Sequence, residues 1–114
     1  MRISKLLLLA SLVVTGAAAA DEFTGTLVDA DCTHRNGGPH ACDAGVNTTS
    51  FGLVAAGRAY LFTRAGSLKA SAAMKERERL HDADPHYPYS KPATALITGQ
   101  QAGKTIIVKR IVIE

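Results

Sequence analysis

Apolar and polar residues alternate in several stretches of the chain, with the period of two that is typical of half-buried strands. In residues 23–29, Phe23, Gly25 and Leu27 share one face and threonines occupy the other. Gly57-Arg58 separates two further stretches of strand formers at hairpin spacing. Five strands are therefore predicted, at residues 23–29, 49–56, 59–63, 93–99 and 105–113.

The last predicted strand changes parity along its length. Ile106 and Val108 share one face, whereas the isoleucines after Lys109-Arg110 fall on the opposite face. Either both faces are buried, or a β-bulge at Lys109-Arg110 returns the later residues to the core. We favour the bulge, because a small closing barrel requires bent strands.

One stretch has the composition of a helix. Residues 67–80 are rich in Ala, Lys, Glu, Arg and Leu, and Ser67 is placed to cap the N-terminus. The apolar stripe is weak, so we expect shallow packing of a face formed by Leu68, Ala72, Ala73 and Leu80. Three prolines exclude regular structure from 81–92, and 100–103 is predicted to turn the chain between the last two strands.

Residues 1–20 have the three parts of a secretory signal: Arg2 and Lys5, an apolar core, and a run of small residues. The apolar core is shorter than the roughly 20 residues that cross a bilayer. We expect cleavage after Ala20, export to the periplasm or the medium, and one mature domain, 21–114, without a membrane span.

Charge excludes one class of partner. Removing Arg2 and Lys5 from the 13 basic residues leaves 11, against 10 acidic ones. A balanced chain without a basic run has no electrostatic footprint for nucleic acid. The partner that we expect, from the fold order and the absence of catalytic residues, is a small ligand or an envelope protein.

Both cysteines, Cys32 and Cys42, lie in the predicted loop after the first strand. In an exported protein such a pair favours a disulfide. Closing so short a loop would stabilise the fold by about 2 to 3 kcal/mol if chain entropy dominates.

The same loop offers an alternative, a zinc or copper site. The spacing is symmetric, Cys32-x-His34 and His40-x-Cys42, and alternate residues of an extended chain point the same way. If the cysteines are oxidised, His34, His40 and Asp31 remain as ligands. No common zinc motif has this spacing, so we predict no cofactor and keep the metal as the alternative.

His86, Tyr87 and Tyr89 form a candidate recognition surface for a sugar, a peptide or a partner protein. The alternative is that the tyrosines cover the barrel as a lid and add to its core. No serine has an attached nucleophile motif, so we predict a recognition or structural domain rather than an enzyme.

The order strand, loop, hairpin, helix, strand, strand is that of the OB-fold, a five-stranded barrel with its helix between strands three and four. The chain also resembles a group of small exported bacterial proteins with an OB-like domain, through 25–32, 49–54, 60–62, 97–99 and 106–108. That group has no established activity. The resemblance implies a mainly β, OB-like barrel and export, and leaves the function open.

Overall fold

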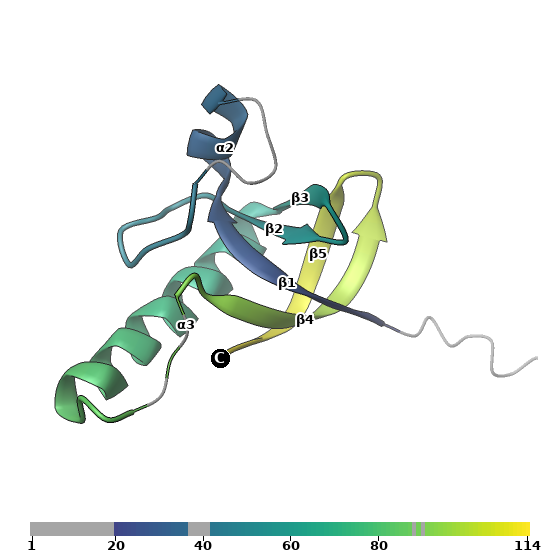
Figure 1. Cartoon of the computed structure of the whole chain (residues 1–114). Coiled ribbons are helices and arrows are strands. Elements are labelled where there is room, and N and C mark those ends of the chain that lie inside the picture. The colour runs from purple at the N-terminus through teal and green to yellow at the C-terminus, as the bar shows by residue number, and fades with distance from the viewer. Residues whose placement is uncertain (1–19, 37–41, 88, 90) are drawn as a thin grey trace, which may run out of the picture.

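The structure is a computed structural model that describes residues 20–36, 42–87, 89 and 91–114, so the predicted leader lies almost entirely outside it. Five strands close into a barrel in the order β1-β2-β3-β5-β4 (Figure 1). They are β1 (Asp21–Asp29), β2 (Phe51–Ala55), β3 (Arg58–Phe62), β4 (Thr94–Ala102) and β5 (Thr105–Ile113). Two helices accompany them, α2 (Ala30–Asn36) and α3 (Arg64–Ala83).

Neighbouring strands pair antiparallel except β3 and β5, which are parallel. The long helix, α3, connects β3 to β4. The predicted fold class is therefore confirmed: a mainly β, five-stranded closed barrel compatible with an OB-like fold. Within the described segments, no helix is both long and apolar enough to cross a bilayer.

The interior of the barrel is filled by the inward residues of alternating strands. In β4, Ala95, Ile97 and Gly99 are buried while the residues between them are partly exposed. The bulkiest fully buried side chains come from four strands and are Leu27, Phe51, Leu53, Ile97 and Ile106. The aliphatic core follows from the period of two in the sequence.

The predicted bulge in the last strand is confirmed at Lys109. Thr98 pairs with Arg110 and Gly99 pairs with Val108, so the register skips Lys109. The isoleucines that follow are therefore returned to the interior, where they pack against the core. This extra residue also bends β5, which helps the sheet to close.

The turns differ slightly from the prediction. Ala56 and Gly57, both with positive φ, join β2 to β3, because a two-residue type I′ hairpin requires that conformation at both central positions. The turn therefore lies one residue before the predicted Gly57-Arg58. The predicted turn at 100–103 is also misplaced, since β4 continues to Ala102 and the chain turns at Gly103-Lys104.

Helix α3 is longer than predicted, and its N-cap is Thr63 rather than Ser67. The Thr63 hydroxyl accepts a hydrogen bond from the Gly66 amide at 3.1 Å. Ser67 is buried inside the first turns, and its hydroxyl accepts from the Phe51 amide at 3.0 Å. At the other end α3 continues to Ala83, into the segment where we expected only a loop.

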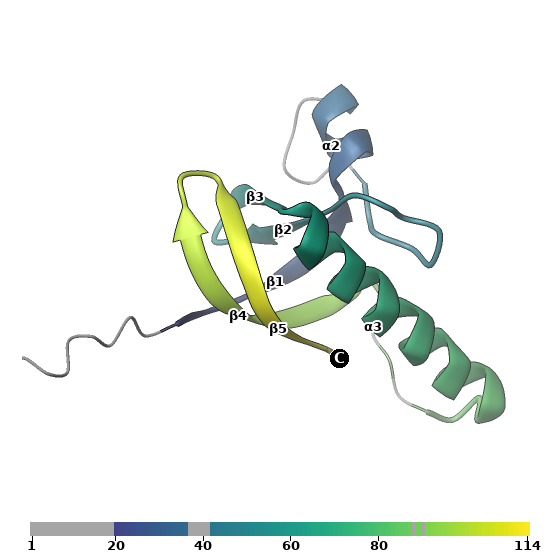
Figure 2. The same ribbon diagram turned by 180° about the vertical axis from the view of Figure 1, so that it is seen from behind.

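The predicted packing face of α3 is also wrong, since Leu68 is 65% exposed. The buried residues are Gly66, Ser67, Ala70, Met74 and Arg77. Figures 1 and 2 show that α3 begins against the barrel and that its C-terminal half extends beyond the strands. The residues after α3 return along this protruding half to β4, and the space between them is where the candidate site lies.

Candidate functional site

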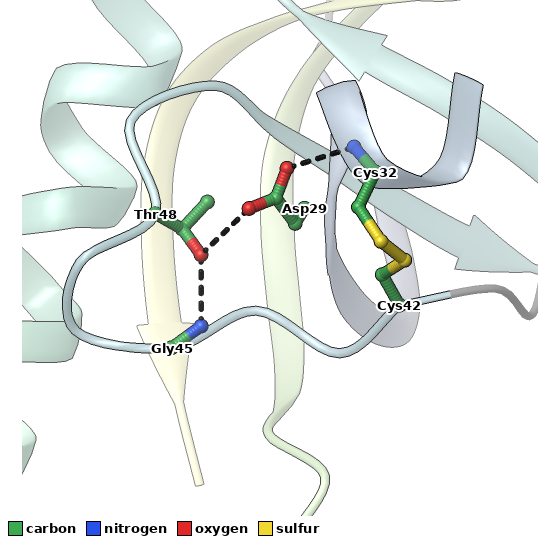
Figure 3. The surroundings of a disulfide bond; sticks show 5 residues. All are labelled: Asp29, Cys32, Cys42, Gly45 and Thr48. Carbon is green, nitrogen blue, oxygen red and sulfur yellow. Dashed lines mark hydrogen bonds between the residues drawn. A yellow bond between two sulfur atoms is a disulfide. The ribbon is translucent and has the colours of Figure 1, made fainter. Parts of the chain in front are cut away.

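The predicted disulfide between Cys32 and Cys42 is confirmed. The two Cα atoms are 5.8 Å apart, within the normal range for a bridge. It links α2 to the segment that leads into β2 (Figure 3). The bridge therefore fixes the start of the 42–50 segment next to the end of β1.

The carboxylate of Asp29 accepts hydrogen bonds from the segments on both sides of the bridge. Asp29 Oδ1 accepts a hydrogen bond from the Cys32 amide at 3.1 Å and so caps α2. Its Oδ2 accepts from the buried Thr48 hydroxyl at 3.4 Å. That hydroxyl in turn accepts from the Gly45 amide at 2.9 Å (Figure 3). Asp29 thus ties the disulfide helix to the 42–50 segment.

The geometry assumed for the alternative metal site is wrong around Cys32. Residues 30–36 are helical, not extended, and residues two apart on a helix do not face each other. Cys32 and His34 therefore diverge. Asp31 and His34 are three apart and exposed, and both line a groove beside Leu61 of β3.

The third predicted ligand, His40, lies outside the described residues. Among the residues that the structure does describe, no three His, Cys, Asp or Glu side chains gather closely enough to hold a metal ion. Of the three predicted ligands, the described part of the chain contains two, Asp31 and His34, which line the same groove.

Tyr89 packs against two consecutive turns of α3. Its ring stacks on that of His81, with centroids 4.1 Å apart and planes inclined by 14°. The Arg77 guanidinium lies over the same ring, 4.1 Å from its centroid, in a cation–π contact. Tyr89 therefore packs on the protruding part of α3, whereas the alternative interpretation was a lid over the barrel.

His86 and Tyr87 lie in a turn that follows α3. The Asp84 side chain accepts from the His86 amide at 3.0 Å, and the Asp84 carbonyl accepts from the Tyr87 amide at 2.8 Å. The His86 side chain is exposed and that of Tyr87 is partly buried. Of the three predicted recognition residues, Tyr89 alone lines the cavity between α3 and the segments 43–46 and 91–93.

A cavity of about 350 Å³ lies between three segments of the molecule. Residues 43–46 form one wall, Met74, Arg77 and Glu78 of α3 form the second, and Tyr89 with 91–93 forms the third. The size falls at the lower end of the range of small-molecule sites, about 300 to 1,000 Å³. The disulfide segment and the tyrosine segment thus meet at one hollow.

The base of the cavity is apolar and its walls carry charges of both signs. Met74 and Ala93, 4% and 3% exposed, belong to the main hydrophobic core. Arg77 is 8% exposed, and this burial lowers the pKa of its guanidinium, although arginine remains protonated in proteins. Asp43 and Lys91 are exposed at the edge.

Sequence reasoning missed Arg77, Lys91 and Asp43. The signal for Arg77 was its helical spacing: Ala70, Met74 and Arg77 recur at intervals of four and three and so lie on one face of a helix. Lys91 and Asp43 carry no sequence signal, because only the folded chain brings their segments together.

Comparison of the chain with family models, with curated proteins and with solved structures finds no match.

Proposed function

We propose that this protein is a non-enzymatic recognition domain of the cell envelope that binds a small ligand in the cavity beside Arg77 and Tyr89. The proposal includes export by the leader, in keeping with the resemblance to small exported bacterial proteins. The observation that carries it is the cavity itself, which combines an apolar base with a buried cation and an aromatic wall. Binding sites for small molecules typically have this composition.

Two further features support the assignment. The walls come from separate parts of the chain that are held independently, one by the Cys32–Cys42 bridge and the Asp29 network and the other by stacking on α3. A site held in this way is largely formed before ligand arrives, which lowers the entropic cost of binding.

The experiment is a screen of small metabolites against ¹⁵N-labelled protein by heteronuclear NMR. We expect at least one compound to shift the amide resonances of 43–46 and 91–93 at saturable concentrations. Arg77→Met, which keeps side-chain length and apolar packing, should abolish these shifts, whereas Arg64→Met, at an exposed position of α3 outside the cavity, should not. Shifts that persist unchanged in Arg77→Met, or no binding at all, would contradict the proposal.

A zinc or copper site is the second candidate function. Asp31 and His34 lie one turn apart on α2 and line one groove, and both are ligand types that zinc accepts. With His40 they would supply three ligands. Calorimetric titration should then give affinity tighter than millimolar that is lost in His34→Ala and in His40→Ala but kept in His86→Ala. Millimolar affinity, or affinity indifferent to His34, would exclude this candidate.

A further inference from the structure

The cavity is lined by two positively and two negatively charged side chains. Arg77 and Lys91 are cationic, and Asp43 and Glu78 are anionic. The two cations gather around the same ring: the Arg77 guanidinium carbon is 4.1 Å from the Tyr89 centroid and the Lys91 ammonium is 5.9 Å from it. Asp43 comes from a different wall, the segment after Cys42. Glu78 lies on the same helix wall as Arg77, so Asp43 is the negative group on a wall separate from both cations.

Two of these four charged groups, Asp43 and Lys91, lie exposed at the edge of the cavity. Neither Asp43 nor Lys91 forms an ion pair within 4.0 Å of another residue in the described segments. Both are therefore available to a ligand. A ligand with a single charge would satisfy one side and face a like charge on the other, which costs binding energy.

We propose that the ligand of this cavity is a free α-amino acid with an apolar side chain. Its carboxylate would face Lys91, its ammonium group would face Asp43, and its side chain would lie against Val46 and Pro92. The volume of about 350 Å³ is large enough for one such molecule. This inference rests on the proposed function and names its ligand class.

Four ligands on one skeleton separate the contributions of the two charges. L-leucine carries both charges, N-acetyl-leucine only the negative one, leucinamide only the positive one, and N-acetyl-leucinamide neither. Titrated by NMR against the protein, leucine should bind tightest, with each singly charged analogue roughly tenfold weaker and the neutral one weaker still. Lys91→Gln should reduce the advantage of leucine over leucinamide, and Asp43→Asn its advantage over N-acetyl-leucine.

Lys104→Gln and Asp82→Asn, at exposed positions away from the cavity, are the matched controls and should leave all four affinities unchanged. Equal binding of the four ligands, or tightest binding of a singly charged one, would refute the proposal that the ligand carries both charges. The cavity would still be a binding site. If none of the four binds but another metabolite from the screen shifts the same resonances, the ligand class alone is wrong. If nothing binds in either experiment, the proposed function fails as well.

Discussion

The barrel interior and the outer half of α3 are packed with different types of side chain. Inside the barrel, Leu53 and Ile97 are fully buried among other aliphatic and aromatic side chains. Along the outer half of α3, the contacts are a stacked pair of rings and a guanidinium over Tyr89. The first region is a cluster of apolar side chains, whereas the second brings charged and aromatic groups together around an open cavity.

This difference follows from where α3 ends. The first turns of the helix lie against the barrel and bury small residues such as Gly66 and Ala70. The later turns extend past the strands (Figure 2), so the strands cannot cover Arg77, and the returning segment does so through Tyr89. Under the proposed function, stability and ligand binding would therefore depend on separate regions, and three substitutions test that separation.

The largest effect is expected in the barrel. Leu53→Ala should lower the free energy of unfolding by about 2 to 5 kcal/mol, because it removes a fully buried side chain and leaves a cavity in a closed core. Urea denaturation followed by circular dichroism measures the change. Leu61→Ala on the neighbouring strand, where the side chain is 48% exposed, is the control and should change stability little. Comparable losses in both variants would refute the division between core and surface.

A smaller effect is expected at the stacked ring. Tyr89→Ala should lower the free energy of unfolding by about 1 to 3 kcal/mol, since it removes one aromatic stack and one cation–π contact. NMR shift changes should be confined to α3 and the 43–46 wall, with the strands unaffected. Tyr87→Ala, outside the cavity, should leave that wall unperturbed. Changes that spread through the barrel strands would show that the two regions are not separate.

Much of the fold was predictable because strand periodicity directly reflects burial. Even the bulge at Lys109 followed from the change of parity in the last strand. The start of α3 was not predictable in the same way, because Thr63 and Ser67 are both residue types found as helix N-caps, and serine is the more favoured of the two. In the fold, the Ser67 hydroxyl accepts a hydrogen bond from the Phe51 amide, and Thr63 caps the helix instead.

The candidate site was predictable only in part. Tyr89 and the disulfide segment were recognised from composition and spacing, yet the cavity that joins them depends on Arg77, a residue whose type is rarely buried. Its burial requires Tyr89 to cover it, and that contact joins residues twelve apart in the chain. The extended geometry assumed for Cys32 and His34 failed because Asp29 caps a helix there.

The smallest effect is expected on the solvent side of α3, where Arg79 donates two hydrogen bonds to Glu76, at 3.0 and 2.6 Å. The hydrogen bond from Arg79 lowers the pKa of the Glu76 carboxyl. Any stabilisation from the pair would therefore be present above the ordinary glutamate pKa of about 4.3 and would disappear as the pH falls through the lowered value. Because both side chains are more than half exposed, solvent screens the pair. Urea midpoints of wild type, Glu76→Gln and the control Glu22→Gln should coincide at neutral and at acidic pH; a wild-type advantage seen only at neutral pH would mean that the exposed face of α3 also contributes to stability.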